Sequence, residues 1–309
     1  MPSSRRIDLE VGGDFDATLA AEVFEPPGSA RALLICFPGG GRNRRYFDLD
    51  VPGDESYSFA RSLAARGYRV VTVDHLGVGD STRPENGFEI TVERLVAANH
   101  AAVMALKKRC GEGLPAIGVG HSMGAMLLLW QQDRFADFDA LALLGFGHGG
   151  MPEVLSTYGR TLASGAALAN SVELARSQFP EGYYRFPEMA ASGEGRMTPA
   201  LIAAMQRAAS DLLTVPGSLS LVPEVARAAA GGIDVPVFSA IGDKDICGDF
   251  ADQARLCGAN GAVTAIELAD TRHNHFLYPS RSELYRALDQ WLSALQEKAQ
   301  PSRRQDGSS

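Results

Sequence analysis

Short apolar segments alternate with helical patterns along most of this chain, and this alternation constrains the fold more than any other feature. Each apolar segment stops at a glycine-rich or polar stretch, and such segments lie at 32–37, 68–75, 115–120, 139–147, 235–242 and 262–269. Segments that are apolar along nearly their whole length are typical of parallel strands covered on both faces. Helical patterns separate them, at 56–67, 92–109, 123–133 and after Ser280. We therefore predict an α/β fold with a mostly parallel central sheet flanked by helices.

Both ends of the chain depart from this pattern. Two strand patterns near the amino terminus, 5–11 and 17–26, follow one another without a helix between them. A connection this short joins antiparallel strands, so we expect the sheet to begin antiparallel. Residues 298–309 are polar and lack periodicity, which predicts a disordered tail.

A long segment, residues 149–234, interrupts the alternation. It contains no strand pattern, and its helical patterns lie at 161–178, 198–213 and 220–230, joined by segments rich in proline, glycine or aromatic residues at 179–189 and 215–218. Its length exceeds that of an ordinary connection between two strands. We predict that 149–234 forms a helical cap over one edge of a core made of 1–148 and 235–297.

The overall composition excludes several classes of protein. Of the 309 residues 45% are hydrophobic, and the net charge of −8 argues against binding to nucleic acid. The amino terminus lacks the apolar segment of a secretory signal, and no apolar run approaches the ~20 residues that cross a bilayer. The cysteines form no C-x-x-C pair, which is typical of reduced thiols in a cytoplasmic protein; they are Cys36, Cys110, Cys247 and Cys257. We expect no metal, no cofactor and no membrane partner, and the sequence leaves open whether the chain forms a homodimer.

The segment GVGHSMGAM, residues 118–126, places Ser122 between two glycines in a G-x-S-x-G motif. Because 33 of the 309 residues are glycine, the motif alone is weak evidence, and its position carries the argument. A buried strand runs into Ser122 and a buried helix follows, as in a nucleophile on a tight turn. Gly120 and Gly124 would relieve crowding where strand and helix meet. We predict that Ser122 is a nucleophile.

A serine hydroxyl needs a base that takes its proton and a carboxylate that orients the base. Asp243 and Asp245 stand just after a predicted strand. His273 and His275 lie on the loop before the last helix. All four positions fall at the carboxyl edge of the predicted sheet, and the residues alone leave open which aspartate and which histidine serve.

An oxygen that becomes negatively charged during the reaction needs backbone N–H donors, each worth roughly 3 kcal/mol. The N–H group of Met123, directly after the nucleophile, is one candidate. The second is Gly40, with Gly39 as the alternative, because these glycines end a predicted strand in the segment CFPGGG. We predict an oxyanion hole formed by Gly40 and Met123.

Five segments in this order, CFPGGG, DHLGVGDS, GVGHSMGAM, GDKD and HNHF, resemble the α/β-hydrolase family over about residues 7–297. The order serine, aspartate, histidine is the one this fold uses. The resemblance implies an α/β-hydrolase fold in which the insertion is a cap. It favours Asp245 as the acid and His275 as the base, with Asp243 and His273 as the alternatives.

Two further segments bear on the resemblance. Residues 74–81 are similar to a turn common in the family, and we expect a structural role for them. Many relatives have His-Gly where this chain has Pro38-Gly39, which leaves the register of the N–H donor less defined.

A serine, histidine and aspartate site with an oxyanion hole performs acyl transfer. We predict a serine hydrolase that cleaves a carboxylic ester, lactone or thioester through an acyl-enzyme on Ser122. An acyltransferase with the same residues and a non-catalytic ligand-binding protein of this fold are the alternatives. The partner is then a small-molecule acyl substrate, largely apolar, and the predicted substrate-binding residues are His148, Tyr183, Tyr184 and Phe186.

Overall fold

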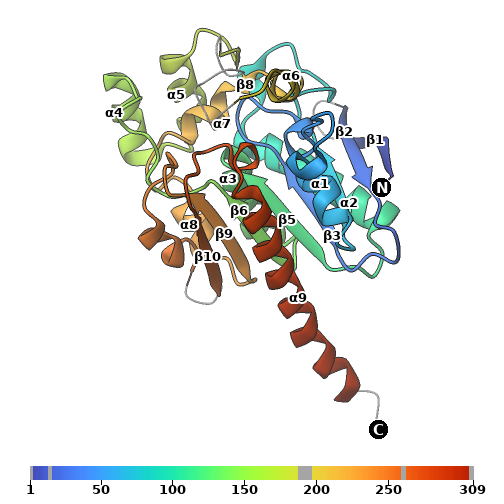
Figure 1. The fold of residues 1–309 in the computed structure, drawn as a ribbon. Helices are drawn as coiled ribbons and strands as arrows, with labels where there is room; N and C mark the ends of the chain where they lie inside the picture. The colour runs from blue at the N-terminus through green and yellow to red at the C-terminus, as the bar shows by residue number, and fades with distance from the viewer. Residues whose placement is uncertain (1–2, 13–15, 187–196, 259–261, 306–309) are drawn as a thin grey trace.

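The computed structural model describes residues 3–12, 16–186, 197–258 and 262–305. Within these ranges the strands of the main sheet are β1 (Ser4–Gly12), β2 (Ala17–Phe24), β3 (Leu33–Phe37), β4 (Arg69–Val73), β5 (Ala116–His121), β6 (Ala140–Leu144), β9 (Val237–Gly242) and β10 (Val263–Leu268). They form one sheet in the order β1-β2-β4-β3-β5-β6-β9-β10 (Figure 1). The β1–β2 and β2–β4 pairs are antiparallel and the other pairs are parallel. The predicted sheet, mostly parallel with an antiparallel beginning, is confirmed.

Helices cover both faces of the sheet, which explains why the parallel strands β3, β5, β6 and β9 are buried along their whole length. These helices are α1 (Phe59–Ala64), α2 (Val92–Cys110), α3 (Met123–Phe135) and α9 (Arg281–Gln305). Leu34 and Cys36 of β3 belong to the same buried cluster as residues of α1 and α9. Leu33 and Phe37 face the other way, into a cluster with α2 and α3. Alternate side chains of one strand therefore enter two different cores.

The carboxyl-terminal helix differs from its prediction in length. Its buried stripe consists of Leu284, Leu288 and Leu292, as the helical spacing indicates. The helix continues to Gln305, whereas a disordered tail was predicted from residue 298. Residues 306–309 of that tail lie outside the described residues.

Among the described helices, none combines the length and the apolar composition of a membrane span.

The segment 149–234, called the insertion below, connects β6 to β9. Its elements are α4 (Thr157–Ala166), α5 (Ser171–Gln178), β7 (Tyr183–Tyr184), α6 (Pro199–Ala208), β8 (Leu212–Leu213), α7 (Thr214–Leu219) and α8 (Arg227–Gly231), and residues 187–196 lie outside the described residues. In Figure 1, α4 to α7 stand beyond the carboxyl ends of the parallel strands. By contrast, α8 packs against α3 beside the sheet, so the end of the insertion flanks the core.

Several local predictions for the insertion were wrong in detail. The first helical pattern divides into α4 and α5, and two short strands, β7 and β8, pair where no strand was predicted. The expected joint at 215–218 lies inside α7. Pro216 is compatible with that helix because it stands in the first turn, where the helix has no partner for an amide N–H.

Candidate active site

Ser122 stands on the sharp turn between β5 and α3. Its backbone has φ of 54° and ψ of −121°, a conformation that non-glycine residues rarely adopt. The Ser122 N–H donates to the carbonyl of Leu144 on the neighbouring strand β6 at 2.8 Å. A side chain at Gly120 would meet the backbone of Ala125, and one at Gly124 would collide with the Phe37 carbonyl. Both glycines are therefore required sterically, as the sequence motif indicated.

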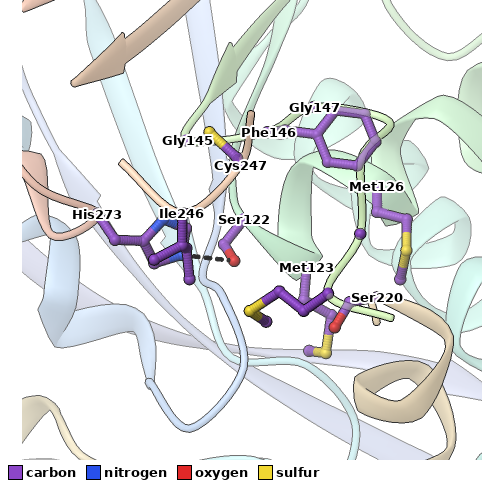
Figure 2. A pocket seen from close by; sticks show the side chains of 12 residues that line it. Ser122, Met123, Met126, Gly145, Phe146, Gly147, Ser220, Ile246, Cys247 and His273 are labelled. Carbon is purple, nitrogen blue, oxygen red and sulfur yellow. Dashed lines mark hydrogen bonds between the residues drawn. The ribbon is translucent and has the colours of Figure 1, made fainter. Parts of the chain in front are cut away.

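His273 connects Ser122 to a buried carboxylate. The His273 Nε2 atom lies 2.9 Å from Ser122 Oγ (Figure 2). Its Nδ1 atom lies 2.7 Å from Asp245 Oδ1. A carboxylate only accepts, so Nδ1 carries the proton, and Nε2 accepts from the serine hydroxyl. The three residues come from the loops after β9 and β10 and from the turn after β5. The order of contacts is that of an activated nucleophile.

The preference for His275 as the partner of Ser122 was wrong, and the alternative, His273, occupies that position. His275 begins the 3-10 turn His275–Leu277 and is completely buried. Its Nε2 atom contacts the second oxygen of Asp245, Oδ2, at 2.8 Å. His273 precedes that turn and faces the serine. Two residues of separation on one loop thus give the histidines different partners.

Asp245, favoured over Asp243, is the carboxylate that reaches the histidines. Asp243 instead accepts the backbone N–H groups of Asp270 and Thr271, both at 2.9 Å, and these bonds hold its pKa below the usual value. Asp243 therefore fixes the loop that carries the histidines and lies outside the chain of contacts to Ser122.

The environment of Asp245 keeps it ionised. Its side chain is inaccessible to solvent, and this burial by itself raises the pKa. Hydrogen bonds from His273 and His275 outweigh burial and hold the pKa well below its usual range. The N–H of Ile246 also donates to Oδ1 at 2.7 Å. An ionised aspartate in this position fixes the tautomer and orientation of the His273 ring.

His121, which was not among the predicted site residues, supports the backbone of His273. It immediately precedes Ser122, is buried, and its Nε2 atom lies 2.8 Å from the backbone oxygen of His273. Burial, together with repulsion from His273 and His275, holds the pKa of His121 well below its usual value. A neutral ring donates from Nε2 to that carbonyl. Only its position next to Ser122 pointed to this role in the sequence.

The predicted N–H donors, Gly40 and Met123, border the space next to the serine hydroxyl. A cavity of about 100 Å³ is lined by Gly39, Gly40, Ser122 and His273 among others. Within the described part of the chain, the N–H groups of Gly40 and Met123 donate to no other group. His75 donates from Nε2 to the Pro38 carbonyl at 3.1 Å and thereby holds this loop from behind.

A larger cavity of about 620 Å³ extends from Ser122 into the insertion. Its residues from the core are Gly40, Ser122, Met123, Ile246 and His273, and those from the insertion are Met151, Val154, Gln178, Phe179, Pro180, Tyr184, Phe186, Leu212, Gly217, Ser220 and Leu221. Figure 2 shows a smaller adjoining cavity of about 50 Å³, which Met123, Met126 and Cys247 line together with Ser122 and His273. The walls are mainly apolar, and thioether side chains adapt readily to different shapes.

Two of the four predicted substrate-binding residues, Tyr184 and Phe186, line this cavity. His148 does not, because it turns to the backbone oxygen of Leu256 at 2.8 Å. Tyr183 points the other way from its neighbour Tyr184, and its hydroxyl donates to the Pro84 carbonyl at 2.7 Å. Met151, Leu212 and Ser220, which sequence reasoning missed, carry no motif that marks them.

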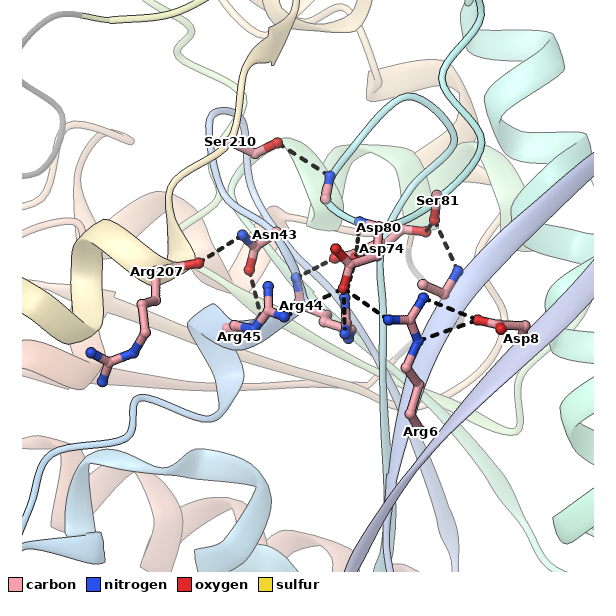
Figure 3. A network of polar contacts seen from close by, with 12 residues as sticks. Arg6, Asp8, Asn43, Arg44, Arg45, Asp74, Asp80, Ser81, Arg207 and Ser210 are labelled. Carbon is pink, nitrogen blue, oxygen red and sulfur yellow. Dashed lines mark hydrogen bonds and ion pairs between the residues drawn. The ribbon is translucent and has the colours of Figure 1, made fainter.

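The turn at 74–81 has the structural role that was expected. Asp74 is buried and its carboxylate contacts Arg44 Nη1 at 2.5 Å (Figure 3). Gly79 has a positive φ of 58°, and any side chain there would collide with that carboxylate.

Hydrogen bonds from the same region reach the insertion. The Gly79 N–H donates to Ser210 of the insertion at 3.3 Å. Asn43 Nδ2 also donates to the Arg207 carbonyl of α6 at 2.9 Å. This network therefore joins the insertion to the loop that carries Gly39 and Gly40.

Solved structures of similar fold include several kinds of enzyme. An esterase from Exiguobacterium antarcticum is 17% identical, with a TM-score of 0.62 over 93% of this chain and 98% of that one. The thioesterase domain from the curacin biosynthetic pathway is 16% identical, with a TM-score of 0.61 over 94% and 99%. A haloalkane dehalogenase loop variant from Bradyrhizobium elkanii is 14% identical, with a TM-score of 0.63 over 96% and 99%. At these identities the likeness concerns the fold.

A family model identifies the fold at the level of sequence. The model described as alpha/beta hydrolase family matches residues 34–286, which contain Ser122, Asp245 and His273 together with the insertion. The fold and the matched family support hydrolase activity, and they leave open which bond is cleaved. This chain belongs to the alpha/beta hydrolase family.

Proposed function

We propose that this protein is a serine hydrolase that cleaves a carboxylic ester, lactone or thioester through an acyl-enzyme on Ser122. The observation that carries the proposal is the continuous series of contacts from Ser122 Oγ through His273 to Asp245, at 2.9 and 2.7 Å.

In the proposed reaction, Ser122 Oγ attacks the carbonyl carbon of the substrate while His273 Nε2 takes the hydroxyl proton. The resulting imidazolium is stabilised by ionised Asp245. The negative charge on the former carbonyl oxygen is met by the N–H groups of Gly40 and Met123. His273 then gives its proton to the leaving alcohol or thiol, and a water molecule activated by the same histidine releases the acyl group from Ser122.

The acyl group is proposed to be largely apolar. The cavity of about 620 Å³ that opens beside Ser122 takes most of its wall from the insertion, through residues such as Phe179, Tyr184 and Leu212. Burial of apolar surface contributes roughly 25 cal/mol per Å², so such walls favour an acyl chain over a charged group. In this proposal the insertion acts as a cap that selects the acyl group, and the core performs the chemistry.

A fluorophosphonate probe with a fluorescent tag tests the proposal, because it reacts covalently with activated serines. We expect labelling of the wild-type protein and none of Ser122→Ala, with p-nitrophenyl ester hydrolysis lost in parallel. Ser220→Ala is the matched control, since Ser220 lines the same cavity but its hydroxyl donates to the Gly217 carbonyl, and it should label normally. A folded wild-type protein that remains unlabelled and hydrolyses no ester, lactone or thioester would refute the proposal.

A further inference from the structure

Asp245 is shared by two histidines, one on each oxygen. His273 Nδ1 lies 2.7 Å from Oδ1, and His275 Nε2 lies 2.8 Å from Oδ2. His275 is fully buried and contacts neither Ser122 nor the space beside it. Two histidines thus approach one carboxylate from different directions, and only one of them faces the nucleophile.

The hydrogen-bonding state of His275 follows from its surroundings. Because an ionised carboxylate can only accept, Nε2 of His275 carries the proton. The other nitrogen, Nδ1, is buried and has no hydrogen-bond partner among the described residues. A buried polar atom without a partner is unfavourable, because it loses its hydrogen bonds to water. An apolar side chain would avoid this cost, so packing alone does not account for a histidine here.

Without His275, the remaining hydrogen-bond donors to Asp245 would hold its Oδ2 atom only weakly. The Ile246 N–H serves Oδ1 at 2.7 Å, the oxygen that also faces His273. Oδ2 otherwise receives the Gly242 N–H at the long distance of 3.4 Å. The Cys247 thiol also contacts the carboxylate, but a thiol is a weak donor. His275 is therefore the strong donor that prevents rotation of the carboxylate.

We propose that His275 is a positioning residue for the reaction of Ser122: its Nε2–H anchors Oδ2 of Asp245 so that Oδ1 stays aligned with Nδ1 of His273. This inference rests on the proposed function. His275 transfers no proton in this role; it restricts the carboxylate, which in turn restricts the ring that takes the proton from Ser122.

Three substitutions of His275 distinguish the effect of its hydrogen bond to Asp245 from the effect of its packing. His275→Gln keeps an amide N–H about as far from the backbone as Nε2. His275→Leu fills a similar volume without a donor, and His275→Asn keeps an amide that is too short to reach Oδ2. The measurements are kcat and KM for a p-nitrophenyl ester and the second-order rate of Ser122 labelling by a fluorophosphonate.

We expect His275→Leu and His275→Asn to lower kcat and the labelling rate by about 10- to 100-fold, with KM within about twofold of the wild type. This loss is smaller than the ~10⁴-fold typical when the aspartate is itself replaced. His275→Gln should restore both rates to within about fivefold of the wild type. His275→Asn provides the comparison if His275→Leu does not fold.

Two outcomes would overturn the inference. In the first, His275→Leu or His275→Asn folds and retains the wild-type kcat. In the second, His275→Gln loses as much activity as the folded His275→Leu or His275→Asn variant. A folded wild-type protein that neither labels nor hydrolyses any ester, lactone or thioester would instead refute the proposed function, and this inference with it. The two failures are therefore distinguishable.

Discussion

The loops at the carboxyl edge of the sheet and the insertion both border Ser122, but different physical constraints determine them. In the loops, Ser122, His273 and Asp245 are fixed by hydrogen bonds of 2.7–2.9 Å and by glycines that no other residue can replace sterically. The insertion meets the same cavity mainly with apolar side chains, which lack directional bonds. The difference suggests that the loops determine the rate of the reaction and the insertion determines the choice of substrate.

The largest effect is expected from His273→Ala. Removal of the base from a serine site typically lowers kcat by about 10⁴- to 10⁶-fold, because Ser122 then keeps its proton. Ester hydrolysis under saturating substrate measures this loss. His100→Gln is the control, since His100 pairs with Asp137 far from the site, and it should retain full activity. Near-normal turnover by His273→Ala would assign the base to another residue.

Replacement of the two aspartates should separate catalysis from loop support. Asp245→Asn should lower kcat by about 10⁴-fold, because an amide favours the wrong tautomer of His273. Asp243→Asn should leave kcat within about tenfold, since Asp243 only receives the N–H groups of Asp270 and Thr271. The kcat values of the two purified variants test this difference. Equal losses would contradict the assignment of Asp245 as the carboxylate that orients His273.

A substitution in the insertion should change selection more than turnover. Tyr184→Ala enlarges the cavity, so the ratio of kcat/KM for long-chain to short-chain p-nitrophenyl esters should rise by about tenfold, a difference of roughly 1.4 kcal/mol. The neighbouring Tyr183 lies outside the cavity, and Tyr183→Phe should keep the wild-type ratio. If Tyr184→Ala lowers kcat equally for every ester, the division between loops and insertion is incorrect.

The last expected effect is on stability in acid and does not involve the reaction. Burial lowers the pKa values of His75, His121 and His148 in the folded protein, whereas the unfolded chain binds these protons near pH 6.5. The unfolded state therefore takes up more protons as the pH falls below about 6.5, and the free energy of unfolding decreases there. Each such histidine contributes up to about 1.4 kcal/mol per pH unit until its folded pKa is reached.

Urea unfolding at pH 7.5, 6.5 and 5.5 measures this dependence. His121→Gln should reduce the slope below pH 6.5, because it removes the contribution of one buried histidine. An unchanged slope in this variant would show that His121 is protonated in the folded protein.

The sequence predicted the fold and the turn around Ser122 well because both follow from local patterns. Apolar strands covered on two faces have a distinctive composition, and Gly120 and Gly124 occupy positions where a side chain collides with backbone. The choice between His273 and His275 was beyond that reasoning. It depends on a short turn that buries the His275 ring, and Phe276 of this turn packs against Phe47 and Phe59, which are distant in the sequence.

The insertion was predicted less accurately for a related reason. Its helices are short, so their ends depend on contacts with the core more than on propensity. The neighbours Tyr183 and Tyr184 illustrate the problem, since both are plausible pocket residues and only Tyr184 lines the cavity. Sequence alone indicates that aromatic side chains gather in this region, but not the face from which each is presented.

The positive φ of Ser122 has a consequence for the evolution of stability in this protein. A non-glycine residue held in such a conformation costs about 1–3 kcal/mol, and the hydrogen bond from its N–H to Leu144 helps to retain it. Glycine at position 122 would relieve that cost and, under the proposed function, yield a more stable but inactive protein. Selection for folding alone therefore opposes a serine at this position, and its presence there indicates a function that outweighs the lost stability.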